Sequence, residues 1–199
     1  MADLVYLVRH AAPPLEKQRR YWGRTDPGVD SDSLAGTAGL ARFFWNRPQI
    51  LLTSPLPRTK ATAEALGRVL ELGPEMVDDL AEVDFGSFEG MNFTEVERRY
   101  PADAREWAEK GDAYAFPGGE SVQDFLARAE RAFTACTERP EEAVMCVTHA
   151  GVIAAWCCLF LRMPSWHRFT FRPEYATLTA FVRKKDGSGW EMAFFNNRD

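Results

Sequence analysis

The sequence contains little cysteine, and the spacing of its cysteines excludes several kinds of cysteine-based site. Only four cysteines occur in 199 residues, and no two form a Cys-x-x-Cys pair, so neither a zinc knuckle nor a thioredoxin-like motif is supported. A chain this long with so few cysteines is not expected to carry a disulfide framework. Because free cysteine packs as a small apolar residue, we expect buried, reduced thiols at Cys136, Cys146, Cys157 and Cys158.

The sequence also lacks a long hydrophobic run, a basic N-terminal segment and an excess of positive charge. Its longest apolar run, at about residues 151–161, is too short to span a bilayer, and no signal peptide is visible. Lys and Arg number 24 against 29 Asp and Glu, which gives a net charge of −5. Because nucleic acids and anionic membranes normally require a basic surface, we expect neither as a partner, and we expect a cytoplasmic location.

What the sequence does contain is the composition of an ordinary globular domain, with 46% hydrophobic and 27% charged residues. Short apolar runs at residues 4–8, 49–53 and 143–148 predict strands that are buried on both faces. Helical patterns alternate with these runs, at residues 34–45, 57–72, 121–138 and 151–161. This alternation predicts a single domain over residues 1–199, an α/β protein of the three-layer α/β/α type with a mostly parallel central sheet.

Three other segments complete the expected domain. A small helical insert is predicted at about residues 84–119, a weakly extended segment at 75–82, and a C-terminal hairpin between strands at 177–183 and 190–195. The outer strand of this hairpin offers an edge through which a second copy of the chain could pair, so a dimer is left open.

Basic side chains follow all three buried strands. Arg9 and His10 come after the first, Arg58 begins the helix after the second, and His149 follows the third. Because the active sites of open α/β sheets lie beyond the carboxyl ends of the strands, these groups are expected to converge. Arginine matches phosphate oxygens bidentately, helix N-termini add N–H donors, and a neutral imidazole is a competent nucleophile at phosphorus. The pattern therefore predicts a phosphate site.

Six segments in chain order carry a more specific signal. They are Val8-Arg9-His10-Ala11, the loop at 21–26, the Ser54-Pro55 to Ala63 segment, Leu80 to Gly90, Pro117 to Ser121, and Val147 to Val152. Together they resemble the motifs of the histidine phosphatase superfamily, which includes the cofactor-dependent phosphoglycerate mutases and many small phosphatases. The resemblance covers about residues 4–165, and six ordered motifs are far more specific than any one of them.

The resemblance implies a role for each matching residue. His10 is the implied nucleophile, which forms a phosphohistidine, and Glu82 is the implied proton donor to the leaving group, preferred over the nearby Asp84 and Glu89. The groups implied to hold the phosphoryl oxygens are Arg9, Arg58 and His149, and the loop residues implied to bind substrate are Gly23 and Arg24.

Some positions depart from the pattern of the family. Ala11 replaces its usual glycine, and Ala12 and Pro13 stand where many members carry polar residues, which leaves the identity of the substrate open. Residues 12–35 and the insert are expected to border the leaving group. Aromatic side chains of the insert are assigned to core packing rather than to stacking on the substrate, at Trp107, Tyr114 and Phe116.

The function that the resemblance implies is hydrolysis of a small phosphate monoester, similar to that of the α-ribazole phosphatase-like group. No metal ion and no cofactor are implied, and the one expected partner is the small phosphorylated substrate. Two alternatives remain, a phosphoglycerate mutase type of phosphoryl transfer and a non-catalytic module that binds a phosphorylated ligand. The chain is shorter than most family mutases, and a binding module would need neither Glu82 nor a nucleophile.

Overall fold

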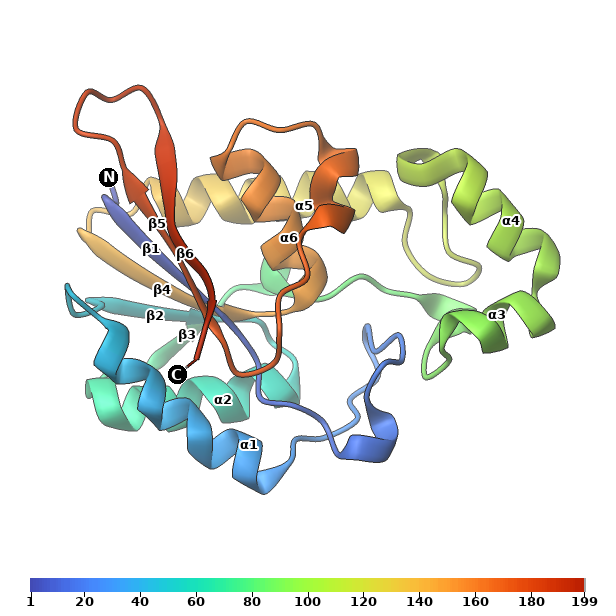
Figure 1. Ribbon diagram of the computed structural model, residues 1–199, viewed down its shortest axis with the longest axis horizontal. Coiled ribbons are helices and arrows are strands. Elements are labelled where there is room, and N and C mark those ends of the chain that lie inside the picture. The colour runs from blue at the N-terminus through green and yellow to red at the C-terminus, as the bar shows by residue number, and fades with distance from the viewer. Residues whose placement is uncertain (199) are drawn as a thin grey trace.

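The computed structural model describes residues 1–198, which contain one six-stranded mixed sheet between two layers of helices (Figure 1). β1, β2, β3 and β4 run parallel, whereas β5 is antiparallel to β1 and pairs with β6 as a hairpin. The α/β fold, the mostly parallel sheet and the C-terminal hairpin are therefore confirmed. Across the sheet, the strands are β3 (Pro74–Met76), β2 (Ile50–Thr53), β4 (Ala143–Thr148), β1 (Leu4–Arg9), β5 (Leu178–Arg183) and β6 (Trp190–Asn197).

The described residues form six α-helices and six short 3₁₀ helices. The α-helices are α1 (Ser31–Gly36), α2 (Pro57–Leu70), α3 (Phe93–Arg99), α4 (Pro101–Lys110), α5 (Val122–Thr137) and α6 (Ala150–Phe160). The 3₁₀ helices are η1 (Leu15–Lys17), η2 (Thr37–Phe43), η3 (Asp78–Leu80), η4 (Gly86–Phe88), η5 (Gly111–Ala113) and η6 (Ser165–Thr170). In Figure 1, α5 and α6 cover one face of the sheet and α1 and α2 the other.

The side chains of the central strand β1 alternate between two apolar cores, as the two-residue period of a strand requires. Leu4, Tyr6 and Val8 belong to the core on the α2 side, whereas Val5 and Leu7 belong to the core on the α5 and α6 side. Five of the six residues of β1 are buried. This explains why the strand is a continuous apolar run rather than an alternating one.

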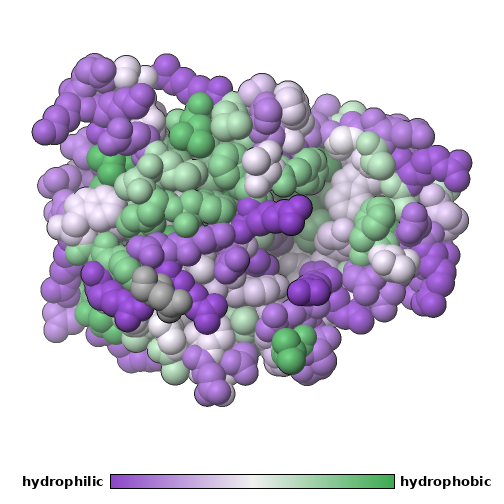
Figure 2. Space-filling view, viewed as in Figure 1, coloured by the Kyte–Doolittle hydropathy of each residue, from purple (hydrophilic) through white to green (hydrophobic). Residues whose placement is uncertain are grey.

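The helical insert lies beyond the carboxyl ends of the parallel strands. α3 and α4 form a pair at one end of the molecule (Figure 1), and Pro101, which cannot continue α3, begins α4. Asn92 starts α3 with a capping box, in which its side chain accepts from Glu95 N while the Glu95 carboxylate accepts from Asn92 N. In the space-filling view the face is hollowed between this pair and the body of the domain (Figure 2).

Two local predictions differ from the structure. The helix predicted at 34–45 begins earlier, at Ser31, because the Asp30 side chain accepts from Ser33 N at 2.8 Å, and from Thr37 it continues as the 3₁₀ helix η2. The extended segment predicted at 75–82 is a strand only at β3, and the chain then turns through η3. After η3 the chain lies at the carboxyl end of the sheet, where Thr148 Oγ1, at the end of β4, donates to the Leu80 carbonyl oxygen at 2.7 Å.

The four cysteines are buried and free, as predicted, and Cys146 Sγ lies 3.6 Å from Cys136 Sγ. Burial raises the pKa of the Cys146 thiol well above its ordinary value and keeps it protonated. Within residues 1–198, no helix combines the length and the apolar character that crossing a membrane requires.

Candidate active site

The basic residues predicted to converge do come together at the carboxyl edge of the parallel strands. Arg9 is the last residue of β1 and His10 follows it, Arg58 lies in the first turn of α2, and His149 is the N-cap of α6. The ring centroids of His10 and His149 are 5.2 Å apart. Since β1 pairs with β4 and β4 with β2 in parallel register, the three strand ends deliver these side chains to one place.

A cavity of about 230 Å³ opens at this edge, and Arg9, His10 and Glu82 line it together with Tyr175. Arg58 and His149 do not line the cavity but are buried beside it, at 1% and 0% exposure. The other four residues to which the sequence assigned chemistry thus surround His10. Its lining also includes Arg20 and the aromatic residues Tyr21, Trp22 and Phe85.

The hydrogen bond of the His10 ring defines which nitrogen can react. His10 Nδ1 lies 2.7 Å from the carbonyl oxygen of Ala11, which can only accept, so Nδ1 carries the proton and Nε2 holds a free lone pair. Burial, followed by the charges of Arg9 and Arg58, lowers the pKa of His10 well below its ordinary value. His10 is therefore a neutral imidazole at pH 7, which is the form that a nucleophile requires.

His149 is also held neutral in the free protein. Burial lowers its pKa well below the ordinary value, and the charges of Arg58 and Arg9 add to that effect. Its Nε2 lies 2.8 Å from Ser54 Oγ, whereas its Nδ1 is buried and has no hydrogen-bond partner within residues 1–198. Negative charge brought next to His149 would raise this pKa, so protonation of the ring would accompany the binding of an anion.

The loop containing Gly23 and Arg24 positions Arg58. The guanidinium of Arg58 donates to the carbonyl oxygens of Trp22 at 2.9 Å and Gly23 at 2.7 Å, and it pairs with Asp26 at 3.3 Å. Neither Gly23 nor Arg24 lines the 230 Å³ cavity. Tyr21 and Trp22 of this loop line the cavity, Gly23 contacts Arg58 through its backbone carbonyl, and the Arg24 side chain is exposed.

Glu89, a sequence rival of Glu82, holds the same loop in place. Its carboxylate accepts from the backbone N–H groups of Gly23, Arg24 and Thr25 at 3.0–3.1 Å. A Cβ at Gly23 would stand 1.9 Å from the carbonyl oxygen of Val83, so only glycine fits this approach. Glu89 is thus engaged in loop structure and does not line the cavity.

Glu82 lines the cavity, and each of its two carboxylate oxygens accepts one backbone hydrogen bond. Its oxygens accept from Val83 N and from Gly151 N in the first turn of α6, each at 3.1 Å, and the side chain is nearly buried. A Cβ at residue 151 would stand 2.3 Å from Glu82 Oε1 and would displace the carboxylate. The other rival, Asp84, accepts from Gly86 N at 3.0 Å and lies outside the cavity lining.

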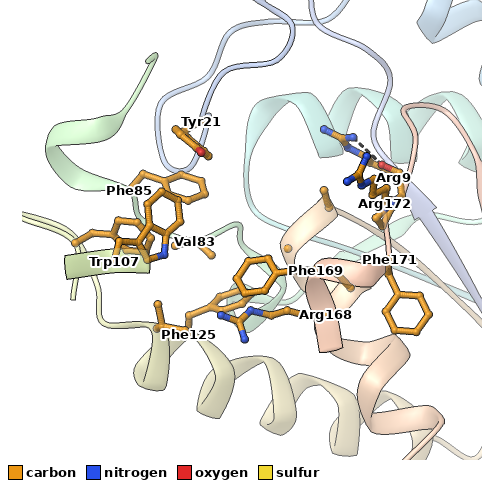
Figure 3. Close-up of a pocket in the computed structure, with 16 residues that line it drawn as sticks. Arg9, Tyr21, Val83, Phe85, Trp107, Phe125, Arg168, Phe169, Phe171 and Arg172 are labelled. Atoms are coloured by element: carbon orange, nitrogen blue, oxygen red, sulfur yellow. Dashed lines mark hydrogen bonds between the residues drawn. The ribbon is translucent and has the colours of Figure 1, made fainter. Parts of the chain in front are cut away.

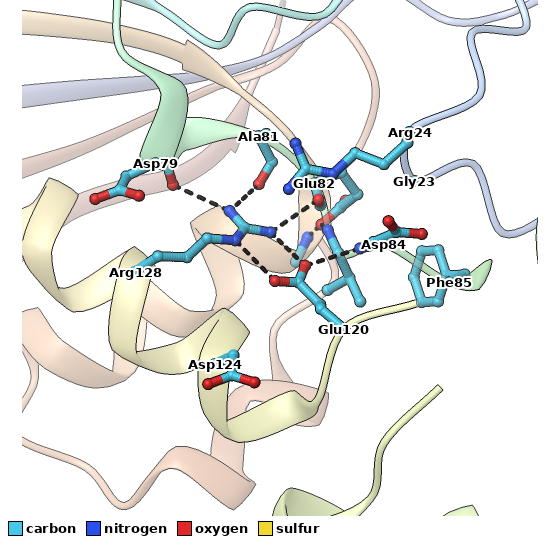
Figure 4. A network of polar contacts seen from close by, with 12 residues as sticks. Gly23, Arg24, Asp79, Ala81, Glu82, Asp84, Phe85, Glu120, Asp124 and Arg128 are labelled. Carbon is cyan, nitrogen blue, oxygen red and sulfur yellow. Dashed lines mark hydrogen bonds and ion pairs between the residues drawn. The ribbon is translucent and has the colours of Figure 1, made fainter. Parts of the chain in front are cut away.

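An ion pair between the buried Arg128 and the partly exposed Glu120 holds the backbone around Glu82, and the sequence analysis missed it. Arg128 donates to the carbonyl oxygens of Asp79 and Ala81, to that of Glu82 at 2.8 Å, and to Glu120 Oε1 at 2.6 Å. Glu120 Oε1 in turn accepts from Asp84 N at 2.8 Å (Figure 4). The pair therefore binds four backbone groups between Asp79 and Asp84, although the bonded residues are 36 to 49 positions apart in the chain.

Tyr175 is a second residue that the sequence analysis missed. It lies on the segment before β5, with the guanidinium carbon of Arg9 3.4 Å from its ring centroid and the His10 ring 5.4 Å away. Arg9 also donates to the carbonyl oxygen of Pro173 at 2.8 Å. A cation over an aromatic face is favourable, so Tyr175 stabilises the position of Arg9 beside His10. No motif surrounds Tyr175 that could have signalled this.

A family model for the histidine phosphatase superfamily (branch 1) matches residues 5–198. A bifunctional protein of Mycobacterium tuberculosis is 33% identical over 185 residues, which are 92% of this chain and 50% of that protein. Phosphoserine phosphatase 1 of Hydrogenobacter thermophilus is 30% identical over 157 residues, 78% of this chain and 74% of that enzyme. The chain thus spans about half the length of the first curated relatives that it matches.

Solved structures share the fold at lower identity. The α-ribazole phosphatase of Shigella flexneri superposes with a TM-score of 0.85 at 20% identity, covering 98% of this chain and 96% of that one. A mycobacterial glucosyl-3-phosphoglycerate phosphatase superposes with a TM-score of 0.81 at 21% identity, covering 98% and 99%. These likenesses concern the arrangement of the whole chain, including the sheet edge at which the histidines lie.

Proposed function

This chain belongs to the histidine phosphatase superfamily, branch 1, and on that premise we propose that it hydrolyses a small phosphate monoester through a phosphohistidine at His10. Its curated relatives include a phosphoserine phosphatase, and several solved structures with its fold are named as phosphatases. The proposal extends the shared chemistry of the family to the residues that surround His10 in this chain.

The observation that carries the proposal is the distribution of buried polar atoms without a partner. Five buried side-chain nitrogens or oxygens in the described residues lack a hydrogen-bond partner, and three of them belong to Arg9, Arg58 and His149. Buried polar groups are nearly always satisfied, so the two unpaired arginine Nε–H donors, close to a neutral histidine, support a site for an anionic acceptor. A phosphoryl group has several oxygens and matches the arginine forks.

In the first half-reaction, the lone pair of His10 Nε2 attacks phosphorus while the bond to the ester oxygen breaks. Glu82 gives its proton to that oxygen, which leaves as an alcohol. Positive charge develops on the His10 ring as the N–P bond forms, and the hydrogen bond from Nδ1 to the Ala11 carbonyl stabilises it. Arg9, Arg58 and a protonated His149 offset the charge that accumulates on the phosphoryl oxygens.

In the second half-reaction, water attacks the phosphohistidine. The Glu82 carboxylate takes a proton from the water, the N–P bond breaks with its electron pair returning to Nε2, and inorganic phosphate leaves. His10 is neutral again and Glu82 is protonated for the next cycle. The positive charge that this phosphoryl transfer needs is supplied by arginine and histidine side chains, so we propose a reaction that does not require a metal ion.

The test is release of phosphate from p-nitrophenyl phosphate by the wild type and by His10→Ala, with and without EDTA. We expect activity in the wild type that EDTA does not reduce, no activity in His10→Ala, and an acid-labile phosphoryl group on the quenched wild-type protein. Loss of activity in EDTA would overturn the metal-free reaction. Activity that survives His10→Ala would overturn the assigned nucleophile, and an inactive wild type would overturn hydrolysis.

A further inference from the structure

A second cavity, of about 440 Å³, adjoins the catalytic one. Arg9, Tyr21, Phe85, Ala150 and Gly151 line both, so the two spaces share a wall. Figure 3 shows this second cavity, with Tyr21, Phe85 and Trp107 on one side and Arg9 on the other. Cavities of this size hold small organic molecules or parts of them.

The lining of this cavity is aromatic. On the insert side, the ring centroids of Tyr21 and Trp107 are 5.4 Å apart and those of Phe85 and Phe116 are 5.1 Å apart. Phe169, on η6, faces them across the opening. Trp107 and Phe116, which were assigned to the core, do pack in it but also present surface to the cavity.

The cavity owes its space to small residues and carries no acidic side chain. Ala150, Gly151 and Ala154 on the first turns of α6 form its floor, where larger residues would fill it. None of its lining residues, all of which lie within 1–198, is Asp or Glu. Three arginines also line it: Arg168, which pairs with Asp112, Arg9, which donates to the Pro173 carbonyl oxygen, and Arg172, so the aromatic surface is accompanied by positive charge.

The position of Glu82 indicates which part of a substrate would enter the aromatic cavity. Glu82 lines the catalytic cavity and accepts from Gly151 N, while its neighbour Val83 lines the aromatic cavity. A general acid must stand next to the leaving oxygen, so the leaving group lies on the side of Glu82. A larger, polar cavity of about 1020 Å³ borders Arg9 and Tyr175 instead, away from Glu82.

We propose that the aromatic cavity binds the leaving group, and that the preferred substrates are phosphate monoesters of alcohols that carry an aromatic ring. This inference rests on the phosphatase activity proposed above and specifies its substrate class. Burying one phenyl ring in such a cavity is expected to raise kcat/KM by about 10- to 100-fold over an ester that lacks the ring.

The experiment compares two esters with leaving groups of similar chemistry, 2-phenylethyl phosphate and ethyl phosphate. Both release a primary alcohol, so a difference in kcat/KM reports binding of the ring rather than ease of departure. We expect the wild type to prefer 2-phenylethyl phosphate by the factor given above. Hydrolysis of neither ester, nor of p-nitrophenyl phosphate, would overturn the phosphatase proposal itself. Equal hydrolysis of both would overturn the aromatic leaving-group site alone.

Three variants test whether the preference for 2-phenylethyl phosphate depends on the aromatic cavity. Phe169→Ala removes an exposed wall of the cavity, and Ala154→Leu fills its floor; each should lower the ratio of the two kcat/KM values several-fold. Trp166→Ala is the matched control, because Trp166 lies on the same 3₁₀ helix, is 61% exposed against 62% for Phe169, and stacks on His167 outside the cavity. The control should keep the wild-type ratio. An unchanged ratio in both cavity variants, or an equal fall in the control, would contradict the assignment.

Discussion

Replacing Glu82 by glutamine removes the proposed proton donor and keeps the size of the side chain. The amide has the size of the carboxylate, but it cannot give a proton to a leaving alcohol. One Glu82 oxygen accepts from Val83 N and the other from Gly151 N. Gln can satisfy only one of these donors with its carbonyl oxygen, because its NH₂ group would face the other N–H.

Glu82→Gln should have separate effects on the free energy of unfolding and on the reaction rate. One buried N–H left without an acceptor lowers the free energy of unfolding by about 1–3 kcal/mol, which a domain of ordinary stability tolerates. Loss of a general acid lowers the rate by about 10²–10⁴-fold when the leaving group needs a proton. p-Nitrophenolate leaves without one, so the same variant should lose far less on p-nitrophenyl phosphate than on ethyl phosphate.

The assay measures kcat/KM for ethyl phosphate and p-nitrophenyl phosphate with the wild type, Glu82→Gln and Asp84→Asn. The parameter kcat/KM reports phosphoryl transfer to His10, so it is insensitive to the later attack of water. Asp84→Asn is the matched control, since Asp84 is a neighbouring carboxylate that bonds Gly86 N outside the cavity, and it should retain activity on both esters. An equal loss on both esters in Glu82→Gln would refute its role as the acid, as would a selective loss in Asp84→Asn.

Three further predictions concern stability and pH. Because the folded state holds the pKa of His10 below the unfolded value of about 6.5, the unfolded chain binds the extra proton on acidification. Between pH 7.5 and 5.5, the free energy of unfolding in urea should fall in the wild type by up to about 1.4 kcal/mol per pH unit more than in His10→Asn. An equal fall in the two proteins would contradict this. Arg128→Met leaves Glu120, whose side chain is 16% exposed, without its ion-pair partner and three backbone carbonyl oxygens without their donor, so it should lower the free energy of unfolding by about 3–5 kcal/mol. Adding Glu120→Gln should recover part of that loss. Gly23→Ala should destabilise the fold by about 1–3 kcal/mol and lower kcat/KM, whereas Gly36→Ala, whose Cβ would meet no atom within 4 Å, should not. Similar thermal unfolding of the two variants would argue against the close approach at residue 23.

Sequence reasoning placed the strand ends correctly because each buried strand is a local feature. Arg9, His10 and His149 follow apolar runs directly, and parallel pairing then brings them to one edge without further information. The η2 segment was less predictable, since a helical pattern does not distinguish an α-helix from a 3₁₀ helix when glycines weaken it.

The sequence by itself determined the fold class, the order of the strands along the chain and the placement of His10 and its basic neighbours at the strand ends. Only the tertiary structure decided what holds these groups and what lies beside them. Tyr175 contacts Arg9, which is 166 positions away in the chain, and Arg128 donates to the carbonyl oxygen of Glu82, which is 46 positions away. The aromatic cavity combines the insert with η6. Such contacts have no periodicity along the chain, because they depend on how separate elements pack, and packing is defined only when the whole sheet and its helices are in place.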